Sequence, residues 1–228
     1  MKPVVGIFSH PDDEVFGPGG TFALFAKEGR DTYIICMTNG EAGQNSLHNG
    51  RELGEVRREE MQKSAKILGI KEIFFLDYKD GTISNSIYHE VAEKISEIIE
   101  RIQPEILITM EQRGITGHLD HIAVSFITTY VFEKHPQVDQ LWYQCMTQES
   151  EKIFKKHFSD YFIYTPPGYS RSEINEVKDI TSVWEQKEQA MHQHATQKED
   201  MDRLLAAFHE LSKEEYFIVV KHPTRDTE

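Results

Sequence analysis

The first indication of the fold is the stretch VVGIFSHPDDEVFGPGGTF, residues 4–22. It begins with an apolar run, residues 4–8, that is followed at once by polar residues, as expected for a buried strand. The glycine- and proline-containing turn GPGG at 17–20 then leads into a segment with helical spacing, residues 21–27. A buried strand followed closely by a helix is the opening of a βαβ unit, which indicates an α/β fold.

The same alternation continues along the chain. Apolar runs rich in Val, Ile, Phe and Tyr predict further strands at residues 33–37, 72–76, 105–109 and 141–145. Helical spacing predicts helices at residues 53–68, 91–102 and about 119–133. We therefore expect a Rossmann-like, mostly parallel sheet with right-handed crossovers and helices on both faces.

The C-terminal part of the chain is less regular. The pattern predicts short strands at 161–164 and 216–220, helices at 182–194 and 198–211, and a turn-rich loop at 165–171. A chain of 228 residues can form one α/β domain. We expect a single domain over residues 1–228, in which 1–150 form the core and 151–228 complete the fold and the substrate pocket.

The amino-acid composition argues against several classes of function. A formal charge of −13 would repel nucleic acid and anionic lipid, so we expect no nucleic-acid partner. No stretch approaches the roughly 20 apolar residues of a membrane span, so the expected location is the cytoplasm. Cys36 and Cys145 lie in separate apolar stretches and are expected to be buried and reduced. The oligomeric state is not decided by the sequence, and a homo-oligomer remains open.

A dense polar cluster, SHPDDE at residues 9–14, follows the first predicted strand. Any one of its acids could cap the next helix, but the group together favours a functional site. A phosphate-binding turn is the competing interpretation, yet GPGG does not have the G-x-G-x-x-G spacing and no P-loop lysine follows. Three carboxylates at the turn would also repel a pyrophosphate, so we rank metal binding above nucleotide binding.

A second cluster, GHLDH at residues 117–121, follows the strand predicted at 105–109. In an open parallel sheet, functional groups gather at the carboxyl ends of the strands, so we expect the two clusters to meet. A hydrolytic zinc site needs three nitrogen and oxygen ligands, a nearby carboxylate base and an acid for the leaving amine. Histidines and aspartates of the two clusters can supply such a set. The spacing of these residues in the sequence does not by itself decide which of them bind the metal.

With SHPDDE at 9–14 and GHLDH at 117–121, the sequence resembles the PIG-L/LmbE-type deacetylases. The signature of this family is a strand followed by (A/S)HPDDE and, later, GHPDH or a close variant. The similarity extends to four further motifs, namely TNGEAG at 38–43, R-x-x-E with A-x-x-LG at 57–69, LDYKDG at 76–81, and K-x-x-A-x-x-x-H-x-x-Q at 187–197. It therefore covers most of the chain. The resemblance implies a Rossmann-like core and hydrolysis of an N-acetylglucosamine-type conjugate to a free amine and acetate.

The resemblance also implies a role for each site residue. His10, Asp13 and His121 would bind Zn²⁺, or another divalent metal such as Fe²⁺. Asp12 would act as general base, His118 would stabilise the oxyanion and protonate the leaving amine, and Asp120 would orient His118.

Two further positions are candidate substrate-binding residues. Arg57 matches a family arginine, with a helix-surface salt bridge to Glu60 as the alternative. Asp80 could contact substrate or support a catalytic histidine, although the DG pair at 80–81 is first of all a turn signal. His194 matches a C-terminal family position and is expected to be structural. The polar segment 43–51, which includes His48, is suited to a rim over the site.

Two residues depart from the family pattern. Leu119 replaces the usual proline between the histidines, and Thr116 stands where some members carry an aromatic hydroxyl. Two alternatives to a sugar deacetylase stay open, a zinc amidohydrolase acting on a non-sugar N-acyl substrate and a sugar- or metal-binding protein without turnover.

Overall fold

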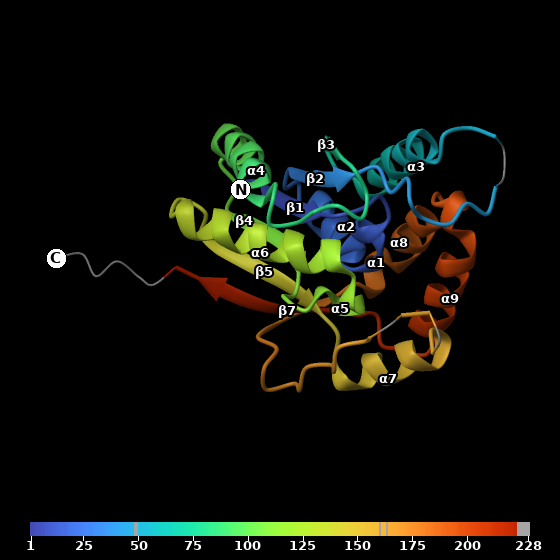
Figure 1. Cartoon of the computed structure of the whole chain (residues 1–228). Coiled ribbons are helices and arrows are strands. Elements are labelled where there is room, and N and C mark those ends of the chain that lie inside the picture. The colour runs from blue at the N-terminus through green and yellow to red at the C-terminus, as the bar shows by residue number, and fades with distance from the viewer. Residues whose placement is uncertain (48–49, 160, 163, 223–228) are drawn as a thin grey trace.

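The computed structural model describes residues 1–47, 50–159, 161–162 and 164–222. Across these residues the chain forms one seven-stranded sheet in the order β3-β2-β1-β4-β5-β7-β6. The strands are β1 (Val4–Phe8), β2 (Thr32–Thr38), β3 (Glu72–Tyr78), β4 (Ile106–Met110), β5 (Gln140–Cys145), β6 (Glu176–Asp179) and β7 (Glu214–Lys221). Figure 1 shows the sheet at the centre of the molecule with helices around it.

The first five strands pair in parallel, and the last two add an antiparallel edge. β1 pairs with β2 on one side and with β4 on the other, so the strand order reverses between β1 and β4. β7 runs antiparallel to β5, and β6 runs antiparallel to β7. A crevice therefore opens at the carboxyl ends of β1 and β4, which is where ligands bind in open α/β sheets.

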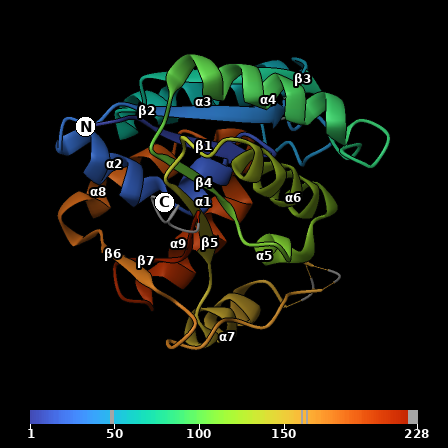
Figure 2. The same ribbon diagram turned by 90° about the vertical axis from the view of Figure 1, so that its left-hand side faces the viewer.

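Helices cover both faces of the sheet (Figure 2). The α-helices are α1 (Asp13–Phe16), α2 (Gly19–Lys27), α3 (Leu53–Leu68), α4 (Tyr88–Ile102), α5 (Gly114–Gly117), α6 (Leu119–Lys134), α7 (Gln148–His157), α8 (Trp184–Met191) and α9 (Lys198–His209), and 3-10 turns lie at Thr181–Val183 and Ala195–Gln197. One apolar core packs α4 and α6 against the sheet, and the other packs α2, α3, α7, α8 and α9. Within the described residues, no helix is long and apolar enough to cross a membrane.

The predicted α/β architecture is confirmed. The strands expected at 4–8, 33–37, 72–76, 105–109, 141–145 and 216–220 all form, with ends shifted by two residues or fewer. The helix predicted at 53–68 is found with the same ends, because apolar residues recur at helical spacing on its buried face. The helix expected at 182–194 is shorter and consists of a 3-10 turn followed by α8.

The strand expected at 161–164 is wrong for the residues described there. Tyr161 lies in a turn and Phe162 has no regular structure, while residue 163 lies outside the described residues. Phe162 stacks on Phe154 and Phe158 at centroid distances of 5.9 and 5.6 Å. Phe162 therefore packs in an aromatic cluster and does not pair in the sheet.

α7 and β6 were not predicted from the sequence. A local signal for α7 exists, because Thr147 and Ser150 form a reciprocal capping box at its start. β6 is a four-residue edge strand with the polar sequence EVKD, which gives no apolar pattern to detect. Both elements pack on the C-terminal side of the fold, where the chain departs from the regular alternation.

A buried ion pair joins the C-terminal part to the loop after β1. Glu215 of β7 accepts hydrogen bonds from the backbone N–H groups of Gly20 and Thr21 at 2.8 and 2.7 Å, so it caps the start of α2. Lys187 of α8 donates to the same carboxylate at 2.7 Å and to the Gly17 carbonyl at 2.9 Å. These bonds hold the β1–α2 connection, and with it the first polar cluster, in place.

Candidate metal centre and active site

The loop after β1 is shaped by hydrogen bonds to its own carboxylates. Asp13 Oδ2 accepts from the backbone N–H groups of Ser9 and His10 at 3.0 and 2.9 Å. Asp12 has φ of 113°, a left-handed backbone that an L-residue adopts only under strain. Its N–H donates to Glu14 Oε2 at 2.9 Å, which stabilises this conformation. The tight turn places the neighbouring carboxylates of Asp12 and Asp13 on different sides of the loop.

Nitrogen and oxygen donors from the two clusters converge at the carboxyl ends of β1 and β4. His10 Nδ1 lies 3.2 Å from His121 Nε2 and 3.8 Å from Asp13 Oδ2. His121 Nε2 lies 3.4 Å from Asp13 Oδ1. In a tetrahedral zinc site with bonds of about 2.0–2.2 Å, ligand atoms are about 3.3–3.6 Å apart. The three side chains therefore fit a small divalent cation.

The tautomer of His121 suits metal binding. Its Nδ1 lies 3.1 Å from the Gly114 carbonyl, so the ring donates there and keeps a lone pair on Nε2. Thr116 Oγ1 also lies 3.2 Å from Nδ1. Burial lowers the pKa of His121 to about 4, with the nearby charge of Asp13 acting in the opposite direction. The imidazole is thus neutral, as a ligand must be.

Two carboxylates support His10 from behind. Its Nε2 lies 3.0 Å from Asp80 Oδ1 and 3.5 Å from Asp120 Oδ2. Burial lowers the pKa of His10, but the nearby carboxylates of Asp120, Asp80 and Asp13 outweigh this effect and raise the pKa to about 10. The site therefore stabilises a positive charge at this position, which either a proton or a metal cation can supply.

Asp80 and Asp120 are themselves held by backbone groups. Asp80 Oδ2 accepts from the Ala42 N–H at 3.1 Å. Burial opposes ionisation of Asp80, but the hydrogen bond and charge of His10 lower its pKa to about 2. Asp120 accepts from the N–H groups of Gly81 and Ile83 at 2.8 and 3.2 Å. Both carboxylates face His10.

Other sets of donors lie in the same cluster. Nitrogens of His10, His118 and His121 lie within 4.8 Å of one another, and so do donor atoms of His10, Asp80 and Asp120. The cluster thus contains more potential ligands than one tetrahedral site uses.

Asp12 faces the cavity beside this cluster and is paired with a buried arginine. The Arg57 guanidinium, 4% exposed, donates to Asp12 Oδ2 at 2.9 Å and to the carbonyls of Pro11 and Gly40 at 2.5 and 2.8 Å. Burial raises the pKa of Asp12 to about 7, although the charge of Arg57 acts against this. A carboxylate with such a pKa can accept a proton at neutral pH.

His118 lies at the mouth of the site and is exposed. Its ring centroid is 4.8 Å from that of His10 and 4.9 Å from that of His121. Burial and the charge of His10 lower its pKa, which favours the neutral ring. Its Nδ1 accepts the Asp120 N–H at 3.3 Å, so the proton of the neutral ring is on Nε2.

A second buried layer lies under the first cluster. Glu14 Oε1 accepts from Ser64 Oγ at 2.7 Å and from His194 Nε2 at 2.8 Å. All three side chains are almost fully buried. Because Glu14 also accepts the Asp12 N–H, this layer supports the strained turn at Asp12. His194 lies in this buried layer and does not line the cavity, which fits the structural role predicted for it.

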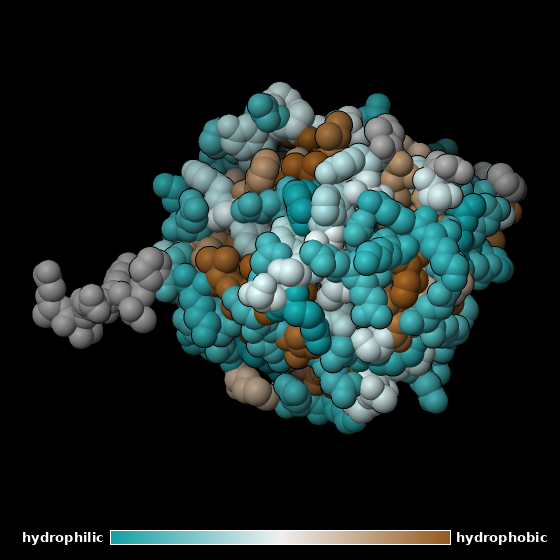
Figure 3. Space-filling model, turned by 90° about the horizontal axis from the view of Figure 1, so that it is seen from below, coloured by the Kyte–Doolittle hydropathy of each residue, from teal (hydrophilic) through white to brown (hydrophobic). Residues whose placement is uncertain are grey.

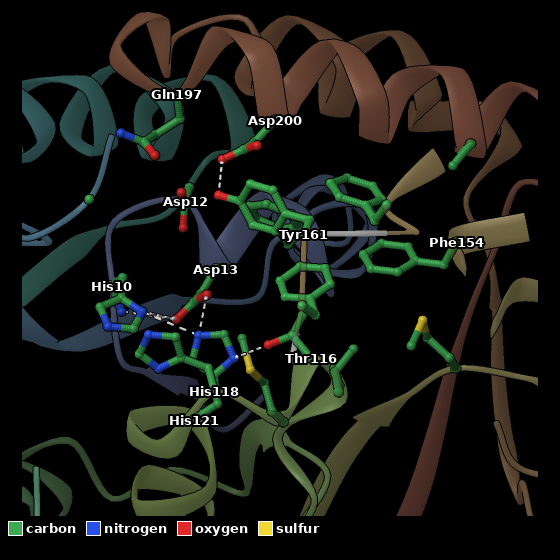
Figure 4. Close-up of a pocket in the computed structure, with 18 of the residues that line it drawn as sticks. His10, Asp12, Asp13, Thr116, His118, His121, Phe154, Tyr161, Gln197 and Asp200 are labelled. Atoms are coloured by element: carbon green, nitrogen blue, oxygen red, sulfur yellow. Dashed lines mark hydrogen bonds and ion pairs between the residues drawn. The ribbon is translucent and has the colours of Figure 1, made fainter. Parts of the chain in front are cut away.

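His10, Asp13 and His121 line a cavity of about 300 Å³. In Figure 4 the labelled polar residues lie toward one end, Tyr161 lies in the middle and Phe154 lies at the other end. Tyr161 donates to Asp200 Oδ2 at 2.8 Å. Asp200 and Gln197 line the cavity on the side of Asp12. One end is thus polar and charged, and the other is apolar.

The structure brings all eight predicted site residues into this region, namely His10, Asp12, Asp13, Arg57, Asp80, His118, Asp120 and His121. The helix-surface alternative for Arg57 is wrong, because Arg57 is buried against Asp12 and Glu60 instead accepts from Thr196. The expected turn at Asp80 exists, and its carboxylate also supports His10. The backbone N–H of Asp120, rather than its carboxylate, contacts His118.

Several residues of the site were not found from the sequence. Glu111 is buried and accepts from Arg113, from the Ile115 N–H and from Tyr169, so it holds the loop before the second cluster. Asp200 lies in the first turn of α9 and Tyr161 in a turn after α7, and their place beside the cavity depends on the whole fold. His48, in the rim segment 43–51, lies outside the described residues.

Comparison with known proteins shows the family of this chain. The family model for GlcNAc-PI de-N-acetylase, PIG-L, matches residues 5–132, which include both polar clusters. The chain belongs to this family. The match covers β1 to α6 and therefore every predicted site residue, whereas α7 to β7 lie beyond it.

Similar proteins extend the comparison over most of the chain. A probable N-acetyl-alpha-D-glucosaminyl L-malate deacetylase 2 from Bacillus cereus is 26% identical over 207 residues, which cover 88% of this chain and 86% of the relative. An N,N'-diacetylchitobiose deacetylase from Pyrococcus horikoshii has a TM-score of 0.68 and 24% identity, covering 99% and 88% of the two chains.

The same fold also occurs in an enzyme with a different reaction. A 4-carboxy-2-hydroxymuconate hydratase from Pseudomonas putida has a TM-score of 0.72 at 19% identity, with both chains covered completely. At such identities the likeness concerns the fold alone, so reaction and substrate must be argued from the site.

Proposed function

We propose that this protein is a metal-dependent hydrolase that removes the N-acetyl group from an N-acetylglucosamine-type conjugate. The observation that carries the proposal is the convergence of His10, Asp13 and His121 at one end of a cavity that the buried carboxylate of Asp12 also lines. The family membership and the names of the relatives support the same reaction.

The metal ligands are His10 Nδ1, Asp13 and His121 Nε2. Each histidine has its other nitrogen next to an oxygen atom, Asp80 for His10 and the Gly114 carbonyl for His121, which orients the ring toward the cation. The mixed nitrogen and oxygen set suits Zn²⁺, and Fe²⁺ is the alternative. When bound, such a cation polarises the amide carbonyl and acidifies a water molecule.

Asp12 is the general base. It lines the cavity, and Arg57 holds its carboxylate in one orientation. Because Arg57 bonds to Asp12 and to two carbonyls, its role is to position the base rather than to bind substrate. Asp80 is assigned to positioning as well, since its carboxylate faces His10 and Ala42.

His118 protonates the leaving amine. In the neutral ring Nε2 carries the proton and can donate a hydrogen bond to the carbonyl oxygen. As general acid His118 acts in its doubly protonated form and returns to the neutral imidazole, and the proton that Asp12 accepts from water replaces the one given to nitrogen. Hydrolysis breaks the C–N bond, adds the water oxygen to the acyl carbon and leaves the amine with the transferred proton. Asp120 supports this residue through its backbone N–H and supports His10 through its carboxylate.

The polar wall of the cavity binds the amino-sugar part. Asp200 and Gln197 line it and are mostly buried, and carboxylate and amide groups suit hydroxyl recognition. Asp200 Oδ1 is buried and has no hydrogen-bond partner among the described residues. A sugar hydroxyl on this wall would satisfy it.

The test measures metal-dependent release of amine and acetate. Chelator-treated protein reloaded with Zn²⁺ or Fe²⁺ is incubated with N-acetylglucosaminyl malate, N-acetylglucosaminyl inositol, N,N'-diacetylchitobiose and N-acetylated amino acids. We expect equal amounts of amine and acetate from at least one sugar substrate, and no turnover after chelation. Turnover of the N-acetylated amino acids alone would favour the non-sugar alternative, and metal-loaded protein that binds sugars without turnover would favour a binding protein.

A further inference from the structure

The cavity continues from the metal centre into an apolar chamber. Its wall consists of side chains from α7, from the segment after α7 and from α9 with the residues that follow it, namely Phe154, Phe158, Phe162, Ala207, Phe208 and Leu211. Phe154 and Phe158 stack at 4.4 Å, and Phe162 stacks on both. Figure 4 shows Phe154 at the end of the cavity away from the histidines.

The six apolar residues named above lie beyond the family match, whereas Phe16, Met110 and Ile115, which line the same cavity, lie within it. The matched residues, 5–132, contain the metal centre but none of the six chamber residues. Seen from below, the side of the molecule that carries α7 is mostly hydrophilic, with apolar residues in separate small areas (Figure 3). Phe154 and Phe158 are only 8% and 4% exposed, so these aromatic side chains face inward.

A sugar ring does not suit this chamber. Burying hydroxyl groups without hydrogen bonds is costly, and the apolar wall offers none. Ser150, which also lines the cavity, is already bonded to Thr147. Gln144 Oε1 lacks a partner among the described residues, but a single acceptor cannot satisfy several hydroxyls. The chamber therefore suits an alkyl or aryl group.

The amide bond divides the substrate into an amine part and an acyl part, and the cavity has two matching ends. Asp200 and Gln197 lie on the polar side, near Asp12, where hydroxyl groups find partners. Resting on the function proposed above, we infer that the apolar chamber receives the acyl part, and that the enzyme hydrolyses medium-chain N-acyl amino sugars in preference to N-acetyl ones.

A chain-length series tests this inference. We expect N-octanoyl-glucosamine to be hydrolysed with a kcat/KM at least tenfold above that of N-acetyl-glucosamine, with N-hexanoyl-glucosamine between them. The physical basis is that each buried methylene strengthens binding by a factor of about four, so three of them already exceed tenfold. Octyl N-acetyl-glucosaminide carries the same chain on the sugar side and should gain nothing over methyl N-acetyl-glucosaminide.

A matched pair of variants links the effect to the chamber. Ala207 lines the cavity and is 1% exposed, whereas its neighbour on α9, Ala206, is exposed. Ala207→Phe should lower the octanoyl-to-acetyl ratio of kcat/KM at least tenfold, and Ala206→Phe should leave this ratio unchanged. Leu211→Trp, which fills the chamber from a half-buried position, should repeat the effect if Ala207→Phe does not fold.

Binding of carboxylate products separates this inference from the proposed function. Titration calorimetry on zinc-loaded protein should show octanoate binding at least tenfold more tightly than acetate, with the advantage lost in Ala207→Phe. Preferential binding of octanoate without hydrolysis of any N-acyl sugar would overturn the proposed function but support the binding of an acyl chain in the chamber. Equal binding of the two acids, or a gain confined to the octyl glycoside, would overturn the acyl assignment even if deacetylation is normal.

Discussion

Replacing Arg57 with methionine should destabilise the protein far more than the same change at its neighbour Arg58. Arg57 is 4% exposed and donates to Asp12 and to two backbone carbonyls. Methionine keeps the apolar stem but leaves a buried carboxylate and two carbonyls without their donor. Breaking a buried ion pair from one side costs about 3–5 kcal/mol.

Arg58 provides the matched control on the same helix. It pairs with Asp77, and the side chains of the two residues are 34% and 59% exposed. Exposed pairs contribute about 0–1 kcal/mol, so Arg58→Met should have a small effect. A difference of about 3 kcal/mol is a large part of the stability of a typical domain, about 5–15 kcal/mol, and easily measured.

Urea unfolding followed by circular dichroism measures this difference. A chelator should be present throughout, because metal binding stabilises the folded state and would hide the effect. The double variant with Asp12→Asn should recover part of the loss, since the uncompensated charge is then removed. A free energy of unfolding for Arg57→Met within 1 kcal/mol of that for Arg58→Met would show that the buried pair does not hold the loop.

Three other changes test separate parts of the site and fold. Asp12→Asn should retain one metal ion per chain by metal analysis but lower kcat at least about 100-fold, because the proton acceptor is lost; loss of the metal would make Asp12 a ligand instead. Asp80→Asn should weaken metal affinity by a factor of about 10–100 in competition with a chelating dye, because His10 loses its orienting carboxylate; unchanged affinity would refute that role. Glu215→Gln should cost about 3–5 kcal/mol in urea unfolding, because the buried Lys187 loses its counter-charge. The same change at the half-buried Glu214 should cost less than about 1 kcal/mol, and equal losses would exclude a special role for Glu215.

The parallel part of the fold was predictable because its signals are local. Strands buried on both faces read as continuous apolar runs, and α3 carries its apolar residues at helical spacing. The run at 161–164 has the same composition as a strand, yet Phe162 within it stacks on Phe154 and Phe158. A local pattern cannot distinguish these two uses of an apolar segment.

The sequence by itself determined the fold class, the family and the two polar clusters, because each depends on residues adjacent in the chain. The tertiary structure decided which contacts the side chains of these clusters make. The placement of β1 beside β4 brings His10 and His121 to 3.2 Å across 111 positions, and the folding of α3 over the first loop buries Arg57 against Asp12. The chamber formed by α7 and α9 likewise exists only once distant apolar segments pack together, since their composition alone is that of an ordinary core.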